Sequence, residues 1–314
     1  MKLTLPHLRT LLRSIAAWFD AEAVSTPVGG AARTIDLARL LPFIAVHAGC
    51  VAVFWVGVSR TAVAVALLLY GLRMFAITGF YHRYFSHNAF RTGRATQFAF
   101  ALLGASAAQR GPLWWASHHR HHHVHSDEPP DSHSALQHGL LWSHLGWFMA
   151  RGNFAPRREL LGSLARYPEL RFLDRWDVLA PAALCVLLYG VGAWAERAAP
   201  ALATTGAQLV VWGFCISTVA LYHATFSINS LAHRFGRRRY ETRDASRNNA
   251  WLALLTFGEG WHNNHHHYPV AARQGFFWWE VDLTYYGLRL PGLLGLVHDL
   301  RPVPAAVRRG EGRR

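Results

Sequence analysis

Long apolar stretches alternate along this 314-residue chain with polar stretches that are rich in histidine and arginine. Four apolar stretches each approach the ~20 residues that an α-helix needs to cross ~30 Å of hydrocarbon. We therefore predict membrane-spanning helices at residues 38–59, 61–81, 178–199 and 207–228. Short connections join the first span to the second and the third to the fourth, which predicts two helical hairpins. The alternative is a soluble all-α protein, but four such runs are too many for chance.

A further apolar stretch, residues 96–108, has 13 residues and is too short to cross a bilayer. It predicts a re-entrant or interfacial helix. We expect one domain over residues 1–314, an all-α integral membrane protein with a helical cap formed by residues 82–177 and 229–300. A charge within a span is costly, and Arg73 lies in the second one. We expect that helix to continue past the bilayer, with Arg73 near the cytoplasmic boundary.

The charge distribution predicts which side the cap lies on. Hydrophobic residues make up 52% of the chain and charged residues 16%, which excludes a disordered protein. Only Arg60 and Arg197 are basic near the hairpin connections, whereas the cap segments are rich in arginine. The positive-inside rule then places both termini and the cap in the cytoplasm, and the near-absence of lysine suggests a bacterial inner (plasma) membrane. This topology accounts for the net charge of +14 without nucleic acid. Residues 301–314 predict a flexible basic tail near anionic lipid headgroups.

Histidine is the chemically unusual component, with 20 residues that are mostly grouped. An HxxxxH group follows the second span, an HxxHH group lies in each cap segment, and an NxxxH group follows the fourth span. With the predicted topology all of them emerge on one side of the membrane. The candidate metal-binding residues are His82, His87, His119, His122, His123, Asn229, His233, His262, His265 and His266.

Residues three and four apart share one helix face. Each HxxHH group is therefore expected to point its three histidines one way, and Asn229 shares a face with His233. His82 and His87 do not share a face on an α-helix. Either the helix ends between them, or they approach from different directions as ligands of two metals would.

Nine imidazoles are too many for one metal and suit two metals with four or five protein ligands each. Imidazole binds iron, copper, nickel and zinc alike. The bilayer setting points to chemistry on a lipid, and oxidation of an unactivated C–H bond needs a redox-active metal and O₂. We therefore expect two iron ions, with O₂ as co-substrate. Carboxylates near the groups could orient the imidazoles or could be solvated surface charges. These carboxylates are Asp127, Glu128, Asp131 and Glu259.

The remaining histidines are expected to matter less. His118, His121, His125 and His267 are expected to lie beside the ligands or at the surface. No role is expected for His7, His47 and His298. His223 could belong to either class.

The motifs in order are HRYFSH (82–87), HHRHHH (118–123) with SDEPPDSHS (126–134), NSLAH (229–233) and GEGWHNNHHHYP (258–269). This order resembles the membrane fatty acyl desaturase family, and most of all its acyl-CoA Δ9 (stearoyl-CoA-type) branch in bacterial form. The likeness covers residues from about 40 to 300. It implies a four-span fold with a cytoplasmic cap, a non-haem di-iron centre bound by the nine histidines above, and a metal-bound water held by Asn229.

The resemblance also implies a reaction, in which two hydrogens leave adjacent methylenes of a saturated acyl chain while O₂ and two electrons are consumed. An apolar tunnel should hold the chain, with Gln109 as a candidate for its bend. Candidate wall residues are Trp114, Trp115, Trp147 and Trp261. An acyl-CoA substrate would need cations for its phosphates, and the candidates are Arg91, Arg94, Arg110 and Arg151. The sequence leaves the carrier, the chain length and the double-bond position open.

Electrons must come from another protein, because the chain lacks a haem-binding HPGG segment, a ferredoxin cysteine run and a flavin-type GxGxxG. We predict a ferredoxin or a cytochrome b5-like protein with its reductase as the donor. Two other functions remain open. A membrane hydroxylase of alkyl, sterol or carotenoid substrates would use similar metal chemistry, and product analysis separates the two. A non-catalytic metal-binding membrane protein would place its polar ligands inside the spans.

Overall fold

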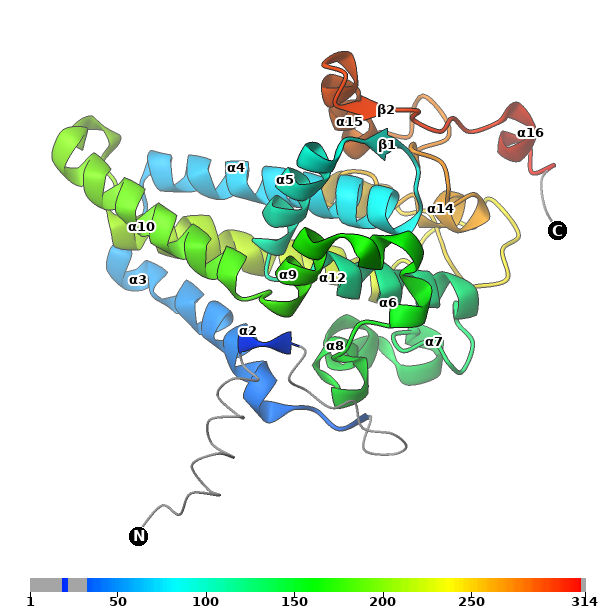
Figure 1. Cartoon of the computed structure of the whole chain (residues 1–314), viewed down its shortest axis with the longest axis horizontal. Coiled ribbons are helices and arrows are strands. Elements are labelled where there is room, and N and C mark those ends of the chain that lie inside the picture. The colour runs from blue at the N-terminus through cyan, green and yellow to red at the C-terminus, as the bar shows by residue number, and fades with distance from the viewer. Residues whose placement is uncertain (1–18, 22–32, 312–314) are drawn as a thin grey trace, which may run out of the picture.

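The computed structural model describes residues 19–21 and 33–311, so His7 lies outside the described residues. Long helices lie side by side and lead into a group of shorter helices and loops (Figure 1). The expectation of a mostly helical protein is confirmed. Strictly all-α is not correct, because β1 (Arg91–Thr92) pairs antiparallel with β2 (Val297–His298) in a small two-stranded sheet.

The long helices form from the four apolar stretches. The first stretch gives α2 (Leu37–Val51) and α3 (Val53–Val56), and the second gives α4 (Arg60–Phe75) and the π-helix η3 (Ala76–Ser86). The third gives α10 (Leu179–Ala198). The fourth gives α11 (Gly206–Leu209), the π-helix η9 (Val210–Ile216) and α12 (Ser217–Ser230).

Three of these stretches form helices that are long and apolar enough to cross a membrane, namely Arg60–Ser86, Leu179–Ala198 and Gly206–Ser230. The first stretch forms a shorter apolar helix, Leu40–Val56. A crossing by the first stretch therefore stays a prediction.

Short turns close both hairpins. Gly57 ends α3 with a φ of 68°, a value that glycine adopts readily, and the Ser59 hydroxyl accepts a hydrogen bond from the Ala62 amide at 3.1 Å to cap α4. In the second hairpin α10 approaches α11 closely. A Cβ atom added at Gly192 would lie 2.6 Å from the Cα atom of Gly206, so the helices meet only because both residues lack side chains.

The cap consists of short helices joined by loops. Its α-helices are α5 (Arg94–Ala105), α6 (Pro112–His125), α7 (Ala135–His138), α8 (Trp147–Met149), α9 (Pro168–Arg175), α13 (Ala250–Leu255), α14 (His262–His267), α15 (Leu283–Leu293) and α16 (Ala305–Arg308). The π-helix η4 (Trp142–Gly146) precedes α8, and short 3₁₀ turns fill other connections. The expected helix at 96–108 is α5.

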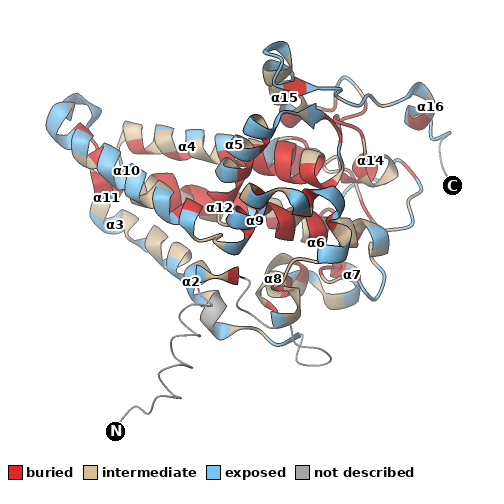
Figure 2. Ribbon diagram, viewed as in Figure 1, coloured by how far each residue is buried: buried red, intermediate tan, exposed pale blue. Residues whose placement is uncertain are grey.

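The largest buried apolar cluster lies where η3 meets the cap. Phe80 stacks on Phe100 of α5 with ring centroids 4.0 Å apart, and Tyr81 and Phe85 are fully buried. Figure 2 shows buried residues concentrated where η3, α6 and α12 meet. This packing fixes the end of the second long helix against the helix that carries the HxxHH group of residues 119–123.

The helix that carries Arg73 continues to Ser86, and the position of Arg73 near the cytoplasmic boundary stays a prediction. Arg73 is fully buried, and its guanidinium donates to the Thr218 hydroxyl at 2.7 Å and to the Ser106 carbonyl at 3.2 Å, so protein groups rather than water satisfy it. The tail is packed rather than flexible as far as it is described. Val307 of α16 is buried against Tyr240, and the Tyr240 hydroxyl donates to the Arg308 carbonyl at 3.0 Å.

Candidate metal centre

The π-helix η3 brings His82 and His87 together. A π-helix repeats its hydrogen bonds every five residues, so side chains five apart approach one face. The helix ends at Ser86, and His87 caps it. The two ring centroids lie 5.0 Å apart. The expectation that the helix ends between them is confirmed, and the alternative that they serve two different metals is wrong for this geometry.

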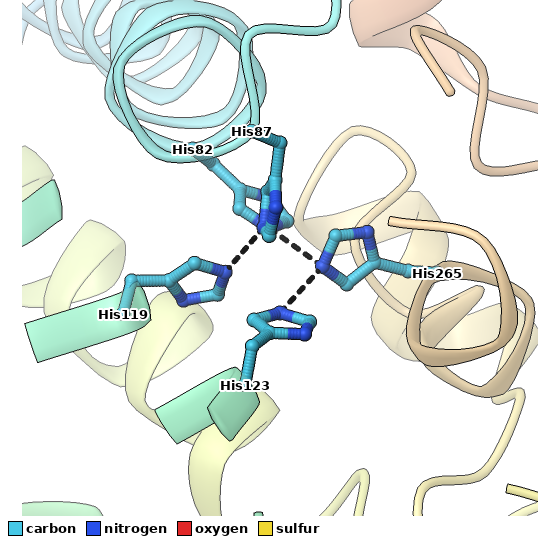
Figure 3. Close-up of side chains that lie close together, drawn as sticks. All are labelled: His82, His87, His119, His123 and His265. Atoms are coloured by element: carbon cyan, nitrogen blue, oxygen red, sulfur yellow. Dashed lines mark hydrogen bonds between the residues drawn. The ribbon is translucent and has the colours of Figure 1, made fainter. Parts of the chain in front are cut away.

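Nine histidines converge into two neighbouring groups, each with ligand nitrogens within 4.8 Å of one another. The five-histidine group contains His82, His87, His119, His123 and His265. The four-histidine group contains His122, His233, His262 and His266. Figure 3 shows the first group, with rings from η3 and its C-terminal cap, from α6 and from α14 pointing toward a common centre. All nine predicted histidines are therefore gathered.

The two HxxHH motifs do not each serve one group, contrary to what a shared helix face suggests. His119 and His123 of α6 point into the five-histidine group, whereas His122 points into the other. On α14, His265 joins the first group while His262 and His266 join the second. Each helix therefore contributes to both groups.

The ring nitrogens face one another in a way that fits a cation between them. The Nε2 atoms of His233 and His262 lie 3.0 Å apart. The other nitrogen of His233, Nδ1, faces the Asp127 carboxylate at 2.8 Å. If Nδ1 carries the proton, Nε2 presents a lone pair. The Nε2 atom of His266 is buried with no protein partner. Converging lone pairs of this kind are the donor set that a metal ion requires.

Carboxylates orient the imidazoles from behind. Asp131 accepts from His122 Nδ1 at 2.9 Å and Asp244 accepts from His266 Nδ1 at 2.8 Å. Glu259 contacts His82 Nδ1 in the five-histidine group. Such contacts fix which nitrogen is free to bind a metal. Asp127, Asp131 and Glu259 thus hold the positions considered for them, whereas Glu128 lies at the surface beside His125.

Burial keeps most of these rings in the neutral form that binds metals. It lowers the pKa of His87, His119, His123, His262 and His265 well below its ordinary range, and repulsion from neighbouring histidines lowers it further. At His122 burial also opposes the proton, but the Asp131 carboxylate outweighs burial and raises the pKa. A metal at His122 would compete with that proton for Nε2.

Several polar neighbours were not predicted. Asp244 lies 22 residues from His266 in a loop, and the Gln274 amide donates to the Glu259 carboxylate at 3.1 Å, with its nitrogen 3.2 Å from His82 Nδ1. His133 is buried beside His122, with ring centroids 4.4 Å apart. No spacing signal marks Asp244 or Gln274, because loops rather than one helix bring them to the site. His133 lies in the quoted SDEPPDSHS motif, and that context was its only signal.

An apolar cavity of about 460 Å³ runs beside the five-histidine group. It is lined by His119 and Asn229 at the metal groups and by residues of α2 and α10 farther away, including Val46 and Cys185. Asn229 thus lies near the candidate centre, and its role in holding a water stays a prediction. A cavity of this size and polarity fits an alkyl chain.

The cavity tests the other predicted residues. Trp114, Trp115 and Trp147 line it, but Trp261 does not and instead donates to the Val281 carbonyl at 2.8 Å. Gln109 also lines it and donates to the Thr225 hydroxyl at 2.8 Å. Of the candidate arginines only Arg110 is in the wall. Arg91, Arg94 and Arg151 lie elsewhere near carboxylates of Asp299, Glu169 and Asp36, respectively.

Three other histidines form a chain outside the metal groups. His47 Nε2 lies 3.2 Å from His223 Nε2, and His223 Nδ1 lies 3.0 Å from His144 Nε2. His47, for which no role was expected, thus links α2 to α12. His118 faces the Ala155 carbonyl at 3.0 Å and His267 stacks on Tyr240, so both lie beside the site.

Comparison with known proteins places this geometry in a family. The family model described as fatty acid desaturase matches residues 33–289. The chain belongs to the membrane fatty acid desaturases. It is therefore an oxidoreductase of lipid metabolism and an integral membrane protein, and its histidine groups are typical of the di-iron sites of such desaturases.

The relatives of this desaturase act on different carriers. An sn-1 stearoyl-lipid 9-desaturase of Anabaena variabilis is 37% identical over 270 residues, covering 85% of this chain and 94% of the relative. A palmitoyl-monogalactosyldiacylglycerol delta-7 desaturase of Arabidopsis thaliana is 38% identical over 244 residues, covering 76% and 62%. An acyl-CoA 5-desaturase of Anemone leveillei is 34% identical over 253 residues, covering 79% and 74%. The expected family is confirmed, but the comparisons do not single out its acyl-CoA branch.

Proposed function

We propose that this desaturase uses two iron ions and O₂ to introduce a Δ9 double bond into a saturated acyl chain esterified to a bilayer lipid. The nine histidines would hold the irons, five at one ion and four at the other, and Asn229 would hold a water beside them. The observation that carries the proposal is the apolar cavity that begins at His119 and Asn229. The lipid-9-desaturase relatives support both the carrier and the double-bond position.

The overall change is the loss of two hydrogens from adjacent methylenes, with O₂, two electrons and two protons giving two waters. Bound iron supplies the activation of O₂. The chain's own residues position and protect the reactants. The cavity wall holds the alkyl chain against His119, and Trp115 stacks on the His119 ring at 5.0 Å between centroids. Its apolar lining excludes bulk water from the reacting carbons.

The charges around the cavity favour a lipid ester as the carrier of the acyl chain. Arg110 is the one arginine among the described residues that line the cavity, and it is already engaged by the Asp177 carboxylate at 3.2 Å and the Phe154 carbonyl at 2.9 Å. Coenzyme A carries several phosphates that need cations. A lipid ester requires no such cluster and can enter from the bilayer.

An acyl-CoA substrate is the second candidate. Relatives named as acyl-CoA desaturases, from Anemone leveillei and Limnanthes douglasii, are 34% identical to this chain.

We further propose that four helices cross a bacterial inner membrane, with both termini and the cap in the cytoplasm, because the arginines avoid the hairpin connections. The electrons would come from a ferredoxin or a cytochrome b5-like protein with its reductase.

The test is expression in a host that lacks unsaturated lipids, followed by fatty-acid analysis that locates the double bond. A Δ9 alkene is expected. A product with added oxygen and no alkene would instead indicate a hydroxylase. The purified protein in nanodiscs is then offered either stearoyl phospholipid or stearoyl-CoA. Turnover of the phospholipid supports the lipid carrier, and turnover of stearoyl-CoA alone assigns the second candidate.

A further inference from the structure

A strongly basic loop joins α12 to α13. Residues 234–247, here called the arginine loop, contain two acidic residues, Glu241 and Asp244. Its arginines are Arg234, Arg237, Arg238, Arg239, Arg243 and Arg247. The loop lies beside α14, at the opposite end of the molecule from the connections α3–α4 and α10–α11 (Figure 1).

Four of these arginines are exposed without a carboxylate partner. Arg239 pairs with Glu280. Among the described residues, no carboxylate lies within ion-pair distance of the exposed residues Arg234, Arg237, Arg238 and Arg243. Phe235, whose exposed fraction is 55%, lies among them. Exposed aromatic and arginine side chains in one patch are typical of protein–protein interfaces.

The arginine loop is also bonded directly to the four-histidine group. The Asp244 carboxylate accepts from His266 Nδ1 at 2.8 Å. The Ala245 amide donates at 2.9 Å to Asp127, the same carboxylate that faces His233. Arg243 is therefore an exposed residue whose chain neighbour contacts a ring of the candidate metal centre.

We propose that the arginine loop is the docking surface for a small acidic protein that carries one electron at a time, and that electrons enter at the four-histidine group. The inference rests on the proposed function, which requires an external donor. A positive surface attracts an acidic partner and speeds its association. The short connection through Asp244 and His266 explains why this surface would suit electron transfer.

Each double bond requires two encounters with the electron carrier. In each encounter the carrier is oxidised by one electron and the iron centre is reduced by one. Two encounters thus supply the two electrons that O₂ reduction requires beyond those from the substrate. Anionic lipid headgroups are the other possible partner of a basic loop. They are disfavoured because the loop lies at the end remote from the hairpin connections (Figure 1).

Binding is measured first, since it does not depend on turnover. The full-length protein in nanodiscs is immobilised, and oxidised plant-type [2Fe–2S] ferredoxin is the acidic probe. Arg237→Glu/Arg238→Glu should lower the association rate constant at low salt by about tenfold or more and weaken its salt dependence. Phe235→Ala should mainly raise the dissociation rate and leave the salt dependence intact. The matched control is Arg166→Glu/Arg171→Glu, which reverses two exposed charges, one just before α9 and one in it.

Association within about twofold of wild type in Arg237→Glu/Arg238→Glu, or an equal loss in the control, would overturn the proposal. A loss seen in phosphatidylglycerol discs but absent in phosphatidylcholine discs would assign the loop to lipid instead. Turnover separates this proposal from the proposed function. Ferredoxin-supported desaturation should fall in the loop variant, whereas desaturation driven by photoreduced 5-deazariboflavin should persist. Absence of desaturation by wild type with both reductants contradicts the proposed function and leaves the binding result to judge the docking surface.

Discussion

At the scale of single residues, the second ring nitrogen determines what each histidine can do. His122, His233 and His266 each direct Nδ1 at an aspartate, which leaves Nε2 to face the centre of the group. Only His82 contacts a carboxylate in the five-histidine group, among the described residues. The two groups thus differ in the negative charge around them, and the four-histidine group is the more strongly supported.

Removing one ring from each group tests the ligand assignment. His122→Ala and His265→Ala should each lower bound iron from about two per chain toward one and abolish desaturation, since a metal loses a ligand. Iron is measured by atomic emission on protein purified from membranes. The control is His125→Ala, on the same helix as His122. The His125 ring is partly exposed, and this variant should keep wild-type iron. Wild-type iron and product in both test variants would contradict the assignment.

The carboxylate contacts give a second test at this scale. Asp131→Asn should weaken iron retention by about 10–100-fold, because the amide supports the His122 imidazole less well than the carboxylate. Titration with a chelator compares it with Glu128→Gln, which changes a surface carboxylate. Equal chelator sensitivity in the two variants would argue against the role of Asp131.

The sequence was sufficient to predict which nine histidines converge, because their groups follow spans in an order that brings them to one side. It could not predict how they divide. Helix periodicity puts His119, His122 and His123 on one face, and that face serves both groups because the groups are neighbours. The rings of His122 and His123 are only 5.6 Å apart. Asp244 could not be predicted either, since its contact depends on the path of a loop.

At the scale of elements, the close approach of α10 and α11 makes a prediction. A Cβ atom at Gly192 would lie 2.5 Å from the Thr205 carbonyl oxygen, whereas one at Gly190 meets nothing within 4 Å. Gly192→Ala should therefore lower the melting temperature in detergent by forcing the helices apart. Gly190→Ala should leave it unchanged or raise it, because alanine favours a helix over glycine. A reversed order of the two melting temperatures would contradict this packing.

Asp174 couples α9 to α6 and should make stability depend on pH. Its carboxylate accepts from the Trp114 amide at 2.7 Å, and burial raises its pKa from 3.8 to about 7. Between roughly pH 4 and pH 7 the folded chain keeps a proton that the unfolded chain has released, so this group makes stability fall as pH rises through that window. Asp174→Asn should flatten the fall in melting temperature. Glu159→Gln, at an exposed carboxylate, should keep it, and an unchanged slope in Asp174→Asn would refute the coupling.

The π-helix η3 is an element that the sequence could not reveal. A spacing of five looks wrong for an α-helix, and no residue pattern in HRYFSH distinguishes the wider repeat. Packing settles it, because Phe80, Tyr81 and Phe85 are all buried in the same core.

At the scale of the whole molecule, the proposed topology places the connection between α3 and α4 on one side of the membrane and the arginine loop on the other. In a cysteine-free background, Val58→Cys should react with an impermeant maleimide in intact cells, whereas Arg243→Cys should react only after the cells are opened. Both side chains are exposed, so access to the reagent depends on the side. Labelling of Arg243→Cys in intact cells would reverse the orientation.

Because α6 and α14 each supply rings to both histidine groups, the same two helices support both groups. A displacement of either helix would move ligands of both ions together, so their separation is set by backbone geometry and is insensitive to any one side chain. Loss of one ion should therefore change the positions of the ligands at the other ion.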